Sequence, residues 1–103
     1  MLHFSDVGEE VDARVARGVA RWTGIHTRLL PYTRDLELAN TLRRLMETEG
    51  RRTGSLRPVT VEGQPAFIYV CLGDALLPFA QGVGPTPALA ICDAFLLCCP
   101  KEP

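Results

Sequence analysis

The sequence has little histidine, almost no lysine and few aromatic residues, and these shortages exclude several kinds of site. Its 103 residues include two histidines, His3 and His26, which lie far apart, and a single lysine, Lys101. No Ser/His/Asp or Cys/His set occurs at a recognisable catalytic spacing, and no glycine-rich phosphate-binding pattern is present. We therefore expect a protein that is not an enzyme and that uses no cofactor.

The cysteines form no C-x-x-C pair, which argues against a zinc site. All four lie in apolar runs, where a free cysteine behaves as a small hydrophobic residue: Cys71, Cys92, Cys98 and Cys99. We expect buried, reduced thiols; a disulfide and a metal site are the alternatives. A secretory signal begins with positive charge and continues with an apolar run, whereas the first twelve residues here are acidic. We therefore expect a cytoplasmic protein, in which thiols stay reduced.

The charge is small in sum but unevenly distributed. A net charge of −1 argues against binding nucleic acid through bulk charge. Residues 13–57 hold ten arginines against four acidic residues, and the densest basic cluster is Arg51, Arg52 and Arg57. Because guanidinium groups bind carboxylates and phosphates bidentately, this cluster is a candidate anion-binding loop. A solvated turn is the alternative, and the same two readings apply to Arg14, Arg17 and Arg21.

Residues 66–72 give the strongest strand pattern in the chain. Alternation places Phe67, Tyr69 and Cys71 on one face of the strand and apolar residues on the other as well, so we expect both faces to be covered. Residues 59–61 and the turn at 62–65 predict a β-hairpin with this strand. Residues 76–80 are a candidate third strand, and residues 82–87 have the composition of a loop.

Apolar residues recur at helical spacing in residues 6–23 and 34–49, which predicts two amphipathic helices, the second capped by Thr33. Residues 87–99 predict a last helix with Thr86 as its cap and Pro87 in its first turn. These patterns predict one α+β domain over residues 1–103. Its small antiparallel sheet of two or three strands is sandwiched between helices, in the order α-α-β-β-(β)-α.

The last predicted helix is apolar nearly all round and too short to span a bilayer. One small sheet and two helices would not cover it, so we expect a homo-oligomer that associates through this C-terminal helix. Asp93 is its only charged residue, and a buried carboxylate needs a partner. Asp93 is either a site residue or the partner of an arginine or a helix-end amide. Trp22 is interpreted as a core anchor, with stacking on a ligand as the alternative.

Three short patches carry a resemblance. They are Asp12-Ala13-Arg14-Val15-Ala16-Arg17-Gly18-Val19-Ala20-Arg21-Trp22, Tyr32-Thr33-Arg34-Asp35 and Pro87-Ala88-Leu89-Ala90-Ile91-Cys92. In this order they resemble the helix starts of the phage ABA (alpha-beta-alpha) sandwich domain family. Ala20 and Arg21 stand where that family usually has Met-Gly, and Asp93 stands where it usually has an apolar residue. The resemblance implies an α/β sandwich encoded in a bacteriophage or prophage, acting in the bacterial host cell, with no assigned catalytic residues.

Two functions fit these features. The first is a non-enzymatic phage accessory protein that binds a host protein or another copy of itself. The second is an oligomer that binds a small anionic nucleotide or metabolite, such as a host-defence signal. The candidate ligand contacts are Arg51, Arg52, Arg57, Trp22 and Asp93. We expect no metal site and no membrane association, and DNA binding is a third, weaker interpretation.

Overall fold

The computed structural model describes residues 9–24, 29–48, 53–72 and 78–98. These residues form three helices and three strands in the order α-α-β-β-β-α, which confirms the predicted α+β class. The elements are α1 (Glu9–Thr23), α2 (Leu36–Thr48), β1 (Thr53–Val61), β2 (Gln64–Leu72), β3 (Pro78–Gly84) and α3 (Pro87–Cys98).

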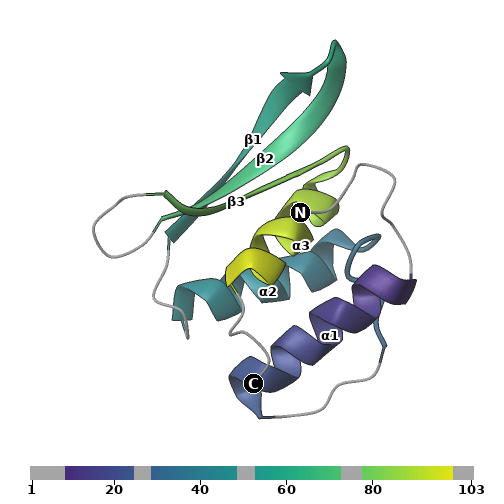
Figure 1. Ribbon diagram of the computed structural model, residues 1–103, viewed down its shortest axis with the longest axis vertical. Helices are drawn as coiled ribbons and strands as arrows, with labels where there is room; N and C mark the ends of the chain where they lie inside the picture. The colour runs from purple at the N-terminus through teal and green to yellow at the C-terminus, as the bar shows by residue number, and fades with distance from the viewer. Residues whose placement is uncertain (1–8, 25–28, 49–52, 73–77, 99–103) are drawn as a thin grey trace.

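The three strands form one antiparallel sheet in the order β1-β2-β3. β1 and β2 pair along their whole length and are joined by a tight turn at Glu62 and Gly63, both of which have positive φ. This turn favours Gly at its second position because glycine has no Cβ to oppose a left-handed backbone. β3 pairs with β2 only from Phe67 onward, so the tip of the hairpin extends beyond the third strand (Figure 1).

The third strand differs from the one predicted, because it continues to Gly84 through residues interpreted as a loop. Glycine is rare inside strands, but here it allows two backbones to come close. A Cβ on Gly82 would overlap the carbonyl oxygen of Ala90 and the amide nitrogen of Ala94, and one on Gly84 would press on Leu89. The loop prediction for residues 82–84 was therefore wrong: these glycines permit β3 to lie directly on α3.

The helices follow the predicted ranges closely, but α2 has a different cap. Asp35, not Thr33, accepts hydrogen bonds at the start of α2, at 2.9 Å from the Glu37 nitrogen and 3.4 Å from the Leu38 nitrogen. The predicted cap of α3 is confirmed, because the Thr86 hydroxyl oxygen accepts from the Leu89 N–H at 3.2 Å. Residues 6–8, 49 and 99 of the predicted helices lie outside the described residues.

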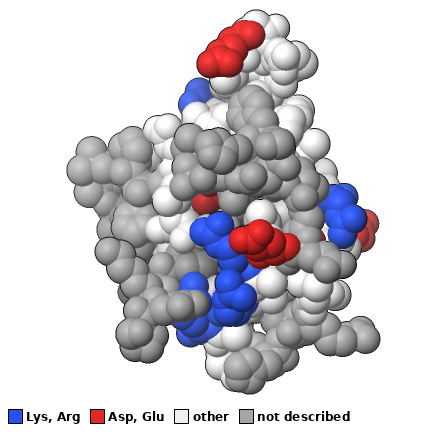
Figure 2. Space-filling model, turned by 45° about the vertical axis from the view of Figure 1, so that its right-hand side comes forward, with Lys and Arg blue, Asp and Glu red and all other residues white. Residues whose placement is uncertain are grey.

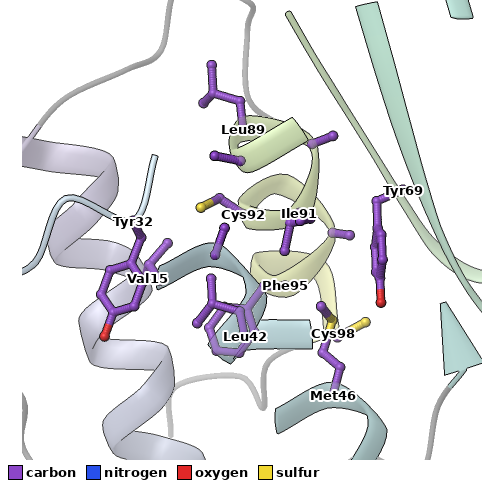
Figure 3. Close-up of a cluster of buried hydrophobic side chains, with 14 of the residues drawn as sticks. Val15, Tyr32, Leu42, Met46, Tyr69, Leu89, Ile91, Cys92, Phe95 and Cys98 are labelled. Atoms are coloured by element: carbon purple, nitrogen blue, oxygen red, sulfur yellow. The ribbon is translucent and has the colours of Figure 1, made fainter. Parts of the chain in front are cut away.

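α3 is the central element of the fold, with the sheet on one side and α1 and α2 on the other (Figure 1). Nine of its twelve residues are buried. Figure 3 shows its side chains packed among Val15 of α1, Leu42 and Met46 of α2 and Tyr69 of β2. A single chain therefore covers the helix that we expected to be covered by a second copy. Leu97 is the residue of α3 that stays exposed, at 49%.

The two faces of the sheet differ in their cover. Tyr69 and Cys71 are fully buried on the inner face, against α3 and α2. Ile68, Val70 and Leu72 lie on the other face and are half-buried. All three described helices lie on the inner side of the sheet (Figure 1). Among the described residues, the layer that we expected over the outer face is therefore not formed by a helix.

Candidate functional site

Three of the residues predicted as ligand contacts are described by the structure, and these three do not come together in one site. Arg57 is exposed on β1, on the outer face of the sheet. Trp22 of α1 packs edge-on against Phe95 of α3, with ring centroids 5.5 Å apart and planes at 75°, which is the geometry of a core anchor. Asp93 is buried in α3. Arg51 and Arg52 lie outside the described residues.

Asp93 has a partner that neither interpretation of the sequence named. Its carboxylate Oδ2 accepts a hydrogen bond from the backbone N–H of Val83, at 3.1 Å. That N–H belongs to β3 and points toward α3 rather than toward β2. Because this amide lies on the edge of the sheet, no neighbouring strand accepts its hydrogen bond. The Asp93 carboxylate is the acceptor that the amide would otherwise lack. The contact gives Asp93 a structural role between β3 and α3.

A second buried carboxylate, Asp12 of α1, was missed in the sequence. It is 1% exposed. Its Oδ1 accepts from the Thr33 N–H at 2.9 Å, and its Oδ2 lies 3.8 Å from the Arg34 guanidinium. Asp12 thereby joins the start of α1 to the segment that leads into α2. Its position three residues before the buried Val15, on the apolar side of the helix, was the one signal available.

The thiol of Cys92 lies near both buried carboxylates. Burial raises its pKa to about 12, and the charges of Asp12 and Asp93 act in the same direction. A thiol with this pKa stays protonated near neutral pH and is a poor nucleophile. Cys71, Cys92 and Cys98 are buried, as expected, and no disulfide joins them to one another. Cys99 lies outside the described residues. Within residues that the structure describes, no cluster of His, Cys, Asp or Glu side chains is arranged to hold a metal ion.

A hollow of about 340 Å³ lies at the start of α3. One side is formed by Thr33, Arg34 and Leu36, and the other by residues 85–89. Its lining is mainly apolar, with the Arg34 guanidinium and the first turn of α3 as its polar parts. This combination of apolar walls and a few polar groups is typical of small-molecule sites.

A smaller hollow of about 180 Å³ is lined by Arg14, Arg17 and Arg21 of α1 together with Leu96 of α3. Figure 2 shows basic side chains gathered on one face of the molecule, with acidic side chains beside them. Arg17 and Arg21 are not free, because each already interacts with other groups of the chain.

None of the described helices is long and apolar enough to cross a membrane. Comparisons with protein-family models, with curated proteins and with solved structures found no match for this chain. The resemblance to the phage family therefore stays a prediction from the three sequence patches.

Proposed function

We propose that this chain is a small, non-enzymatic accessory protein of phage or prophage type that acts by self-association. Its docking surface is the outer face of the sheet, and its partner there is a second copy of the chain. The observation that carries this proposal is the row of half-buried apolar side chains on that face, which no described helix covers. The row consists of Val59, Ile68, Val70, Leu72 and Val83.

The strand register places apolar side chains of β2 and β3 side by side on this face, with the polar residues Arg57, Ser55 and Gln81 beside them. Ile68 of β2 lies opposite Val83 of β3, and the side chains of Val70 and Leu72 follow on the same face at the strand period of two. A row of half-buried apolar side chains on a sheet face that no described helix covers is a candidate interaction surface. It replaces the C-terminal helix as the expected interface, because α3 is already buried within its own chain.

Charge complementarity favours a second copy as the partner. Arg57 and Glu62 are both exposed on the β1–β2 hairpin, on either side of Val59 along the strand. In a twofold dimer every contact occurs twice, so a pairing of Arg57 of one copy with Glu62 of the other would form two ion pairs across the axis. Pro58 lies between them and has no N–H to donate, which makes edge-to-edge strand pairing unfavourable. Face-to-face packing of two sheets is the arrangement that remains.

Size-exclusion chromatography with light scattering tests the interface. The wild-type chain should run as a dimer at micromolar concentration, and Ile68→Lys should run as a monomer with an unchanged circular dichroism spectrum. Thr60→Lys is the matched control, since Thr60 is exposed and faces away from the patch; it should remain a dimer. A monomeric wild-type chain, or a dimeric Ile68→Lys, would contradict the proposal.

A charge exchange tests the twofold geometry independently. Arg57→Glu and Glu62→Arg should each weaken the dimer, and the double variant should restore it. If the double variant is weaker than either single variant, the two residues do not meet across the axis. The phage-type origin is tested by the gene neighbourhood: flanking phage genes support it, and flanking chromosomal housekeeping genes contradict it.

A further inference from the structure

We propose that the hollow lined by the arginine stripe of α1 is a binding site for a small anion with several phosphoryl groups in a row. The hollow measures about 180 Å³, and its described lining is Arg14, Arg17 and Arg21 of α1 with Leu96 of α3. It lies on the helical side of the molecule, whereas the proposed dimer interface is the outer face of the sheet (Figure 1). The two proposals therefore do not depend on each other.

The three arginines follow one face of α1. Their spacing of three and four residues places the side chains on successive turns of the same face, because an α-helix has 3.6 residues per turn. From Arg14 to Arg21 the helix rises about 10 Å, at 1.5 Å per residue. A linear anion with several charged groups can contact all three guanidinium groups, whereas a compact anion such as sulfate can contact only those at one place along the stripe.

Positive charge is in excess along this face. Like charges three and four residues apart on a helix repel one another, so the arginine stripe favours a bound anion. Within the part of the chain that the structure describes, Arg14 has no ion-pair partner, although Glu10 lies one turn before it. Asp12, a second acidic residue of α1, is buried and is held by Thr33 and Arg34. The carboxylate of Glu10 is thus set against three guanidinium groups.

The existing contacts of the stripe are compatible with such a ligand. Arg17 and Arg21 already interact with other groups of the chain. A guanidinium carries five N–H donors in a rigid fork and stays charged throughout the physiological pH range, so phosphoryl oxygens can share it with a present partner or replace that partner. Arg14 and Arg17 are exposed and Arg21 is half-buried, which leaves the stripe accessible from solvent.

The lining favours recognition of the phosphoryl groups alone. Leu96 supplies the apolar part of the described lining, so an attached ring or aliphatic chain has little surface to pack against. Binding then depends on charge-assisted hydrogen bonds, which guanidinium groups form bidentately with phosphate oxygens. We therefore expect inorganic triphosphate and a nucleoside triphosphate to bind with similar affinity.

Isothermal titration calorimetry of the full chain with inorganic triphosphate tests the site. At low ionic strength binding should saturate at one ligand per chain. The affinity should fall about tenfold near physiological salt, because the Debye length shortens from about 30 Å at 0.01 M to about 8 Å at 0.15 M. The absence of saturable binding, or an affinity that does not change with salt, would overturn the proposal.

Three further ligands define the chemistry of the site. Adenosine triphosphate should bind within about threefold of inorganic triphosphate, and sulfate about tenfold more weakly because it contacts fewer guanidinium groups. Equal affinity for sulfate would overturn the assignment to a chain of phosphoryl groups. Tighter binding of a single-stranded oligonucleotide than of triphosphate would overturn the assignment to a small anion and indicate a nucleic-acid backbone instead.

Charge-removing variants locate the site. Arg14→Gln and Arg17→Gln should each weaken triphosphate binding about tenfold, and both should keep the wild-type circular dichroism spectrum because these side chains are exposed. Arg44→Gln is the matched control, since Arg44 is an exposed arginine of α2 that lines a different hollow; its affinity should stay within twofold of wild type. Glu10→Gln should tighten binding about twofold, because it removes the negative charge on the same face. Unchanged affinity in both Arg14→Gln and Arg17→Gln, or an equal loss in Arg44→Gln, would overturn the assignment.

Discussion

The carboxylate of Asp93 accepts a hydrogen bond from the backbone N–H of Val83 at 3.1 Å, which ties α3 to the outer edge of β3. An edge strand presents unpaired amides that invite association with other strands. Here the carboxylate of Asp93, on the adjacent helix, accepts a hydrogen bond from one of those amides. The edge is further covered by α3 itself, because Gly82 and Gly84 let its backbone approach closely. The single charge on an apolar helix is thus explained by the strand that packs on it.

Removal of the Asp93 carboxylate should destabilise the fold. Asp93→Ala removes the acceptor of the part-buried Val83 N–H, so we expect the free energy of unfolding to fall by about 1–3 kcal/mol. Asp93→Asn keeps one carbonyl oxygen as an acceptor and should cost about 1 kcal/mol. Urea denaturation followed by circular dichroism measures both. Glu10→Ala, an exposed site on α1, should stay within about 0.5 kcal/mol of wild type. Equal losses in the two Asp93 variants would show that the charge matters rather than the acceptor.

The close approach of β3 and α3 should make Gly82 intolerant of any side chain. In Gly82→Ala the new methyl group would overlap backbone atoms of Ala90 and Ala94, so we expect a loss of about 2–3 kcal/mol. Gly63→Ala is the comparison, because Gly63 has φ +78° but open space around it. It should cost only the backbone strain, about 1 kcal/mol. The idea fails if Gly63→Ala is the more destabilising of the two in urea denaturation.

The buried thiol of Cys92 should make the protein sensitive to alkaline pH. Its pKa is about 12 in the folded chain and near the ordinary value of 9.0 when the chain unfolds. Between these values the unfolded state binds fewer protons, so this thiol contributes stability below pH 9 that is lost as the pH rises toward 12. The contribution should fall by about 1.4 kcal/mol per pH unit.

The free energy of unfolding, measured in urea from pH 8 to 11, tests this for wild type and Cys92→Ala. Cys92→Ala should be less stable at pH 8 because it leaves a small cavity, but its stability should decline less steeply with pH. Burial also raises the pKa of Tyr69, and this residue contributes to the alkaline decline in both proteins. Parallel curves for the two proteins would mean that Cys92 titrates alike in the folded and unfolded states.

The local patterns of the sequence predicted the elements that depend on neighbours along the chain. The alternation in residues 66–72, the helical spacing in α1 and α2 and the Thr86 cap of α3 all involve residues within four positions of one another. The sequence did not reveal that Gly82 and Gly84 belong to a strand, since a glycine pair favours a loop until a helix backbone is placed against it. The cap of α2 was assigned to Thr33, whose N–H is instead held by Asp12, 21 residues away.

The candidate sites depended almost entirely on contacts between distant residues. Trp22, which we interpreted as a core anchor from its place in the apolar stripe of α1, packs against Phe95 of α3. The hollow at the start of α3 joins Thr33 and Arg34 to residues more than fifty positions later, and no spacing in the sequence indicates it.

The sequence by itself determined the order of helices and strands and which residues are apolar, because hydrophobic periodicity and capping act over a single turn or strand. Only the tertiary structure decided that α3 lies at the centre, that Asp12 and Asp93 are buried against backbone amides, and that one face of the sheet is left without a described helix. These outcomes depend on which distant segments pack against one another. The pattern of a single helix or strand does not specify its packing partner, so they become visible only in the folded chain.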